Sequence, residues 1–310
     1  MTPAARALDP VELARLASMT LRARMIVEGA YAGIHHNPHA GTSIEFAEHK
    51  EYTPGDDVRR IDWKVAGRVD RYYVKQFEDE TEMRTFLCLD ASASMGYRGL
   101  GSDDGGGGRA PRVSKLEYGS YLAAALGYLL GQQGDPAGLI VFDEVTRSYL
   151  PPRARPGHIR DLFSALEAAA PRGGTDPARA LGHVNELAER RSFIALFTDL
   201  LDAAPHLEAR LRQLRARGHD VVLFHILDPD EVDLPFEDLT HFEGVEPGDG
   251  RRLLADPHDL RAAFRRESLA LREKWRLRCL EARAEYRFTT TNTPPTTVLR
   301  DLLMARQRLG

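Results

Sequence analysis

Four mainly apolar runs that alternate with helical patterns constrain the fold more than any other feature of this sequence. The runs cover residues 85–89, 137–142, 192–198 and 221–227. Strands that read as continuous apolar runs, with helices between them, are typical of a parallel sheet whose two faces are both covered. We therefore expect an α/β fold built on a doubly wound, mostly parallel, Rossmann-like sheet.

The spacing of apolar residues predicts the remaining elements. Helices are expected at residues 10–28, 115–130, 158–169, 177–190, 206–217, 259–286 and 298–308. Further strands are expected at residues 45–52, 241–243, 252–254 and 285–288. The β-α alternation thus begins only after residue 80, and the N-terminal part follows a different pattern.

The first apolar run ends in three oxygen-bearing side chains. Asp90, Ser92 and Ser94 follow one another at every second position. Because an extended backbone repeats every two residues, the three side chains can point toward one spot. Oxygen-only ligands of this kind suit a hard divalent cation such as Mg²⁺ or Mn²⁺. The alternative is a polar turn in which one of these residues caps a helix.

Two later segments offer oxygen atoms at comparable places. The loop at residues 173–177 leads into a helix that Asp176 can cap, which leaves the hydroxyl of Thr175 free for another contact. The run at residues 192–198 ends at Asp199. Ligands of such sheets bind beyond the carboxyl ends of the strands, so we expect these segments to share one site for Mg²⁺ or Mn²⁺. The expected metal ligands are Asp90, Ser92, Ser94, Thr175 and Asp199.

Composition excludes several classes of protein. The chain has 310 residues, a formal charge of −4 and two cysteines, which argues against a general binder of nucleic acid or of anionic membranes. Cys88 and Cys279 fall on apolar patterns and are expected to be buried thiols. There is no apolar run of 18 residues, and charged residues interrupt the N-terminal segment, so we expect neither membrane insertion nor a signal peptide. These features indicate a cytoplasmic protein.

Residues 59–77 interleave basic and aromatic side chains, a pattern found on surfaces that bind nucleic acid. Acidic residues are interspersed through the same stretch. We therefore interpret it as paired charges around a buried Trp63 and expect no nucleic-acid partner.

The segment Gly99–Gly108 has low complexity and follows the expected ligands directly. Its glycine-rich composition predicts a flexible stretch. We interpret it as a surface insertion that hangs over the candidate site.

The candidate site and the N-terminal stretch together resemble known families. The pattern of Asp90, Ser92, Ser94, Thr175 and Asp199 matches the metal-ion-dependent adhesion site of von Willebrand factor type A domains. A second set of residues is similar to the hallmark of the family called domain of unknown function 58. That set comprises Glu45, Phe46, Tyr52, Pro54, Gly55, Asp56, Asp57, Arg59, Ile61, Asp62, Trp63, Arg68 and residues 114–118.

The resemblance implies a von Willebrand factor A-like domain at residues 81–310, with a family-specific segment at residues 1–80 packed on it. It implies that the five residues of the site hold the ion, with Asp199 acting directly or through water. An acidic side chain of a partner protein would fill the open coordination position. Members of the family often accompany MoxR-type AAA+ ATPases, which implies a chaperone-like role in the maturation of other proteins. The chain departs from the family pattern at His49, where Arg is the common residue, and in its Gly-rich insertion.

Three classes of function stay open on the sequence. The first is a non-enzymatic, metal-dependent protein-interaction module. The second is a metal-dependent phosphoesterase or hydrolase that uses Asp90 with Lys115 nearby, although no second carboxylate adjoins Asp90 and no His–acid pair is evident around it. The third is a structural domain with a vestigial metal site.

Overall fold

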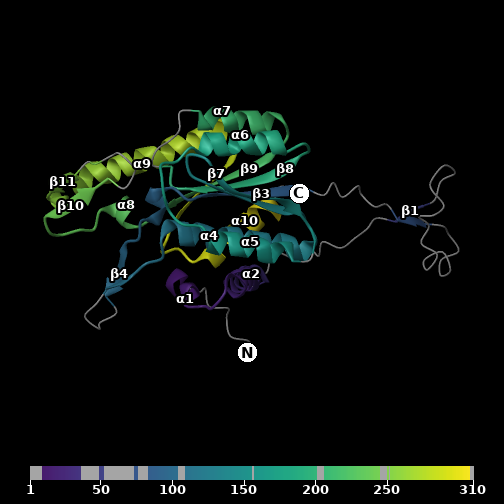
Figure 1. Ribbon diagram of the computed structural model, residues 1–310, viewed down its shortest axis with the longest axis horizontal. Helices are drawn as coiled ribbons and strands as arrows, with labels where there is room; N and C mark the ends of the chain where they lie inside the picture. The colour runs from purple at the N-terminus through teal and green to yellow at the C-terminus, as the bar shows by residue number, and fades with distance from the viewer. Residues whose placement is uncertain are drawn as a thin grey trace. The chain divides into compact units, whose positions relative to one another are not determined.

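The computed structural model (Figure 1) describes most of the chain, in two compact units. The described residues are 9–35, 49–51, 73–75, 83–103, 109–155, 157–200, 206–244, 250 and 252–307. The larger unit comprises Met1–Ile34 and Met83–Gly310, and the smaller one His35–Glu82. In the smaller unit, β1 (His49–Glu51) and β2 (Tyr73–Lys75) form an antiparallel pair. Trp63 lies outside the described residues.

A six-stranded sheet forms the centre of the larger unit, with the strand order β12-β9-β8-β3-β6-β7. All neighbouring strands in it are parallel except β6 and β7, which are antiparallel. The strands are β3 (Arg84–Asp90), β6 (Ala137–Phe142), β7 (Thr146–Arg153), β8 (Ser192–Thr198), β9 (Asp220–Leu227) and β12 (Glu285–Thr290). The expected α/β class with a mostly parallel sheet is therefore confirmed.

Helices cover both faces of this sheet (Figure 1). One face is covered by α1 (Pro10–Ala14), α2 (Met19–His35), α4 (Lys115–Gln133), α5 (His158–Glu167) and α10 (Pro295–Gln307). The other face is covered by α6 (Pro177–Leu187), α7 (Leu207–Ala216) and α9 (Pro257–Glu281). The short elements are η2 (Ala93–Gly96), α8 (Asp230–Asp233) and the antiparallel pairs β4 (Leu100–Asp103) with β5 (Arg109–Pro111) and β10 (Thr240–Glu243) with β11 (Arg252–Ala255).

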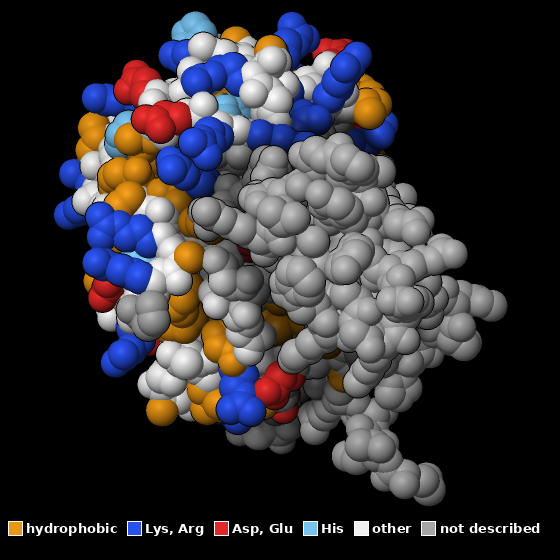
Figure 2. Space-filling model, turned by 90° about the vertical axis from the view of Figure 1, so that its right-hand side faces the viewer, with side chains coloured by type: hydrophobic (Ala, Val, Ile, Leu, Met, Phe, Trp, Pro, Cys, Tyr) orange, Lys and Arg blue, Asp and Glu red, His pale blue; other side chains and the backbone are white. Residues whose placement is uncertain are grey.

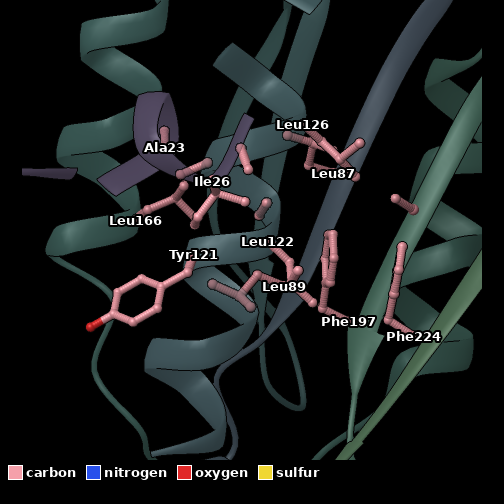
Figure 3. Packing of buried hydrophobic residues seen from close by; sticks show 14 of the residues in the cluster. Ala23, Ile26, Leu87, Leu89, Tyr121, Leu122, Leu126, Leu166, Phe197 and Phe224 are labelled. Carbon is pink, nitrogen blue, oxygen red and sulfur yellow. The ribbon is translucent and has the colours of Figure 1, made fainter. Parts of the chain in front are cut away.

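The two faces explain why the strands read as continuous apolar runs. On β3, Leu87 and Leu89 enter the core beneath α4, whereas Phe86 and Cys88 enter the core beneath α6 and α7. Side chains of successive strand residues point to opposite faces, so a strand covered on both sides needs apolar residues at every position. Figure 3 shows Leu87 and Leu89 in the first of these cores, beside Phe197 and Phe224, whose rings stack with their centroids 4.8 Å apart.

The helix expected at residues 10–28 is in fact two helices, α1 and α2. Arg22 of α2 stabilises the junction between the two helices, because its guanidinium donates to the backbone oxygens of Leu13 (3.1 Å) and Leu16 (2.8 Å). Both helices, up to Ile34, belong to the larger unit and pack against the face that carries α4 and α5.

The antiparallel strand β7 is absent from the sequence-based prediction. It contains Pro151 and Pro152. Proline cannot donate a hydrogen bond to a ladder and is confined to edge strands and bulges, so the local pattern argues against a strand. β7 lies at the edge of the sheet, where these prolines are tolerated.

The cysteines, the helices and the surface charges also bear on what the composition predicts. Cys88 and Cys279 are both buried free thiols, as expected. In the described part of the chain, no helix is long and apolar enough to cross a membrane. On the face shown in Figure 2, basic side chains are numerous, with acidic and hydrophobic side chains among them. The absence of a nucleic-acid partner stays a prediction.

The position of Leu87 at the centre of the sheet generates a test of the fold. Leu87 is fully buried, so Leu87→Ala should lower the free energy of unfolding by about 2–5 kcal/mol, through lost burial and the cavity left behind. Leu280, on the exposed side of α9, is 64% exposed. Leu280→Ala should therefore change the free energy of unfolding by less than about 0.5 kcal/mol. Urea unfolding of the two variants measures both values, and similar losses in both would contradict this packing.

Candidate metal site

The candidate site lies where the strand order of the sheet reverses. From β3 the chain crosses to β6 on one side, and later to β8 on the other side of β3. In open α/β sheets, ligands bind in the crevice outside the carboxyl ends of such strands. Asp90 is the last residue of β3 and Asp199 directly follows β8. Both carboxylates are fully buried and lie at the carboxyl ends of two neighbouring strands, where the sequence predicts the site.

The segment after β3 is shaped by Asp90 itself. Its Oδ1 atom accepts a hydrogen bond from the backbone N–H of Ser92 at 2.9 Å. The helix η2 begins directly after Ser92, and this turn places the Ser92 and Ser94 hydroxyl oxygens 3.2 Å apart. Both serine side chains are buried. The structure thus brings the three residues of the Asp-x-Ser-x-Ser motif together.

The loop before α6 is held against this segment by its backbone. The N–H of Ala93 donates to the carbonyl oxygen of Gly173 at 2.9 Å. Gly173 has a φ of +70°, in the left-handed region that favours glycine. The loop delivers Thr175, whose hydroxyl donates to Asp90 Oδ2 at 2.7 Å.

Helix capping explains why Thr175 is available for this contact. Asp176 caps α6 by accepting from the N–H of Arg179 at 2.9 Å, and Pro177 is the first residue of the helix. The sequence predicts both roles, and the structure confirms them. Because Asp176 satisfies the helix terminus, the hydroxyl of Thr175 can face Asp90 instead.

Thr198 is a further partner of Asp90 that the sequence analysis did not single out. Its hydroxyl donates to Asp90 Oδ2 at 2.7 Å. Thr198 is the last residue of β8, which pairs directly with β3. Its place beside Asp199 is visible in the sequence, but its contact with Asp90 depends on the order of the strands.

The Asp90 carboxylate is surrounded by neutral donors. Within the described ranges, no ion pair joins it to a basic side chain, and its hydrogen bonds come from one amide and two hydroxyls. Burial and, to a smaller extent, the negative charge of Asp199 raise the pKa of Asp90 to about 6, although the hydrogen bonds from Thr198, Ser92 and Thr175 lower it. Among the described residues, the charge of this carboxylate is therefore stabilised only by hydrogen bonds from neutral donors.

Asp199 has a different environment. Lys115, the fully buried first residue of α4, donates from Nζ to Asp199 Oδ2 at 2.8 Å and to Glu231 Oε1 at 2.5 Å. Burial lowers the pKa of Lys115, but the two carboxylates outweigh this effect and the net shift is upward. Lys115 therefore stays charged and compensates the negative charge of Asp199. In the described structure, no basic residue does the same for Asp90.

A second acidic and basic cluster adjoins the pair of Lys115 and Glu231. Arg112 Nη2 lies 2.6 Å from Asp228 Oδ1 and 2.5 Å from Asp230 Oδ1. Gly99 fits against this cluster only because it has no side chain, since a Cβ atom there would lie 2.0 Å from Arg112. Asp228 directly follows β9, as Asp199 follows β8.

The described residues of the Gly-rich insertion, 99–103, are more regular than their composition predicts. Leu100–Asp103 and Arg109–Pro111 pair as the antiparallel strands β4 and β5, and Gly99 donates its N–H to Asp228 Oδ2 at 3.2 Å. The described part of this segment is thus a strand pair and not a structureless flexible stretch.

The donor set fits a hard divalent cation. The site presents the Asp90 carboxylate together with the hydroxyls of Ser92, Ser94 and Thr175, which are oxygen ligands suited to Mg²⁺ or Mn²⁺. Thr175 donates its proton to Asp90, so the lone pairs of its oxygen are available to a cation. No group of three or more His, Cys, Asp or Glu side chains in the described structure is placed to hold a metal. An ion at this site would therefore rely on hydroxyl oxygens.

Comparison with known proteins agrees with the family resemblance. Residues 48–274 match the family described as "Protein of unknown function DUF58", and the chain belongs to this family. The uncharacterized proteins Rv1480 of Mycobacterium tuberculosis (strain H37Rv) and Mb1516 of Mycobacterium bovis are each 29% identical to it over 268 residues. These matches cover 85% of this chain and 80% of each relative.

Two solved structures from Bacteroides are also similar to the chain. The conserved hypothetical protein BatB from Bacteroides thetaiotaomicron matches 73% of this chain and 99% of its own, with 14% identity and a TM-score of 0.46. An aerotolerance-related membrane protein from Bacteroides fragilis matches 70% and 97%, with 20% identity and a TM-score of 0.43.

The raised pKa of Asp90 predicts an unusual pH dependence of stability in the metal-free protein. The folded-state pKa of about 6 lies above the ordinary value near 3.9, so between pH 7 and pH 5 the folded state binds a proton that the unfolded state does not. The contribution of Asp90 should therefore become more favourable by about 1 kcal/mol as the pH falls through this range. Chemical unfolding in EDTA at both pH values, with wild type and Asp90→Asn, isolates this contribution. An identical pH dependence in the two proteins would contradict the assignment.

Proposed function

We propose that this chain is a non-enzymatic, metal-dependent protein-interaction module that works in the cytoplasm with a MoxR-type AAA+ ATPase, in chaperone-like maturation of other proteins. The choice of partner rests on the resemblance to von Willebrand factor A-like members of the family. The metal dependence rests on one observation, the buried Asp90 carboxylate that has no basic partner among the described residues.

The hydroxyls around Asp90 support metal binding by the chain. Asp90, Ser92, Ser94 and Thr175 would hold Mg²⁺ or Mn²⁺. Asp199 would act directly or through water, because Lys115 already donates to its Oδ2 atom. A bound ion would supply positive charge and a coordination position for an acidic side chain of the partner. The partner's carboxylate would be attracted strongly there, since the ligands are partly or fully withdrawn from water.

The contacts of Lys115 favour binding over hydrolysis. A hydrolase that used Asp90 as nucleophile or metal ligand would need a base or a second activating group beside it. Lys115 donates instead to Asp199 and Glu231, and no hydrogen bond joins it to Asp90 in the described structure. We therefore assign Lys115 the role of positioning Asp199.

Metal should stabilise the wild-type protein through Asp90. A ligand that binds only the folded state adds about 2.7 kcal/mol of stability at a hundredfold excess over its dissociation constant. Thermal melts with Mg²⁺, Mn²⁺ and EDTA should show this gain in wild type and not in Asp90→Asn.

Asp220→Asn is the matched control for these melts. Asp220 is the first residue of β9, at the opposite end of the strand from the site, and it pairs with Arg215 and Arg191. This variant should keep the full metal response. An equal response in Asp90→Asn and in wild type would remove Asp90 from the metal site.

Binding of the ATPase should need the metal held by this chain. Titration calorimetry of the nucleotide-free MoxR-type ATPase with wild type should give binding in Mg²⁺ and none in EDTA. Asp90→Asn in Mg²⁺ should also fail to bind, which separates a metal on this chain from one on the ATPase. Equal affinity in Mg²⁺ and EDTA would exclude recognition through a bridging metal. Turnover of a generic phosphoester with Mn²⁺, lost in Asp90→Asn, would favour the hydrolase instead.

A further inference from the structure

The two edges of the central sheet are built differently. β7, at one edge, contains Pro151 and Pro152. Prolines on an edge strand block pairing with another chain, because they lack the N–H that a ladder needs. β12, at the other edge, contains no proline and, in the described ranges, pairs only with β9. In the described structure, the sheet is thus protected from further pairing at the β7 edge and unpaired at the β12 edge.

The open edge of β12 carries backbone groups that can accept another strand. The N–H of Thr291 donates to Leu227 of β9 at 3.0 Å. Because backbone groups alternate in direction along a strand, the N–H groups of Tyr286, Phe288 and Thr290 point away from β9. The carbonyl of Thr290 accepts from Thr293 at 2.9 Å. The outward carbonyls of Tyr286 and Phe288 accept no hydrogen bond from the described part of the chain.

A groove of about 430 Å³ runs along this edge. It is lined by all six residues of β12 and by Thr293, Thr297, Val298 and Asp301. Successive side chains of a strand point to opposite faces, so a groove that touches all six residues follows the edge of the strand. Its lining residues Thr297, Val298 and Asp301 belong to α10, so the groove lies between this edge and α10.

The side chains beside the groove differ on the two faces of the strand. On the face toward α9, Phe288 is 36% exposed, with the Arg272 guanidinium 4.7 Å from its ring centroid. On the face toward α10, Arg287 pairs with Glu285 (Nε to Oε1, 2.6 Å), and the side chain of Asp301 is 53% exposed. Arg300 in turn pairs with Asp301 (Nε to Oδ1, 3.4 Å), so on this second face each of the two carboxylates has an arginine partner.

We propose that the outer edge of β12 binds an extended segment of a partner protein, which adds a seventh strand to the sheet. The unpaired N–H and C=O groups require an extended backbone in the partner, and addition of a strand to a sheet edge is a general mode of peptide recognition. Apolar side chains of the segment pack on Phe288, and polar side chains at the alternate positions face the ion pairs of Glu285 and Asp301. This site is separate from the proposed metal site and needs no metal.

Residue-resolved amide exchange of the full chain tests the proposal, with a defined peptide as probe. In the free protein, the amides of Tyr286, Phe288 and Thr290 should exchange rapidly, and those of Arg287 and Thr289 slowly. An acetylated peptide of alternating valine and lysine should slow exchange at the first three. The same peptide with alternate backbone nitrogens methylated should not slow exchange at these amides.

Two variants extend the test to the protein. Phe288→Pro removes an outward N–H and should weaken binding of the valine–lysine peptide about tenfold, whereas Asp301→Asn, which leaves the backbone intact, should weaken it less. If Phe288→Pro fails to fold, the methylated peptide decides the question with the wild-type chain. Slow exchange of the three outward amides in the free protein would show that the edge is already covered by this chain or by a second copy, and would overturn the proposal. Equal binding of the methylated and unmethylated peptides would overturn it as well.

Discussion

The candidate site depends on the burial of one carboxylate, that of Asp90, at the end of the central strand β3. Removing such a charge from water costs several kcal/mol unless other groups compensate it. Asp90 receives only neutral donors among the described residues, and the pKa of its carboxyl rises to about 6 as a result. Asp199, one strand away, is equally buried but is paired with Lys115. This difference assigns the two acids their roles: Asp199 is already compensated, and Asp90 is the group that an added cation would stabilise.

The surrounding structure holds this arrangement in place. Lys115 begins α4 and links Asp199 to Glu231 of α8. Arg112, three residues earlier, ties the same segment to Asp228 at the end of β9. Three neighbouring strands, β3, β8 and β9, therefore end in acids that are fixed by hydrogen bonds or ion pairs to one connecting segment. Substitutions in that segment should disturb the site even where they touch no expected ligand.

The apolar runs and the acids that follow them predicted much of the fold and of the site. They predicted the bounds of β3, β6, β8 and β9 to within one residue. They also predicted that Thr175 is free to join Asp90, because Asp176 caps the helix. The sequence did not reveal the contact of Thr198 with Asp90, because that contact depends on which strands are neighbours. It also did not reveal β7, whose prolines mask a strand, or the break between α1 and α2, which is stabilised by the Arg22 side chain. Local patterns determine the helices and strands. The pairing of Lys115 with Asp199 joins positions 84 residues apart, so local patterns do not reveal it.

The most direct test of Asp90 as a buried metal ligand is to measure the protonation of its carboxyl group. Its ¹³C chemical shift can be followed against pH in protein labelled at aspartate, and Asp90→Asn assigns the signal. Without metal, the midpoint should fall near pH 6, and saturating Mg²⁺ should move it well below the ordinary value, because a bound cation favours the charged carboxylate. A midpoint near 3.9 without metal, or one that Mg²⁺ leaves unchanged, would contradict the account of Asp90 as a buried, uncompensated metal ligand.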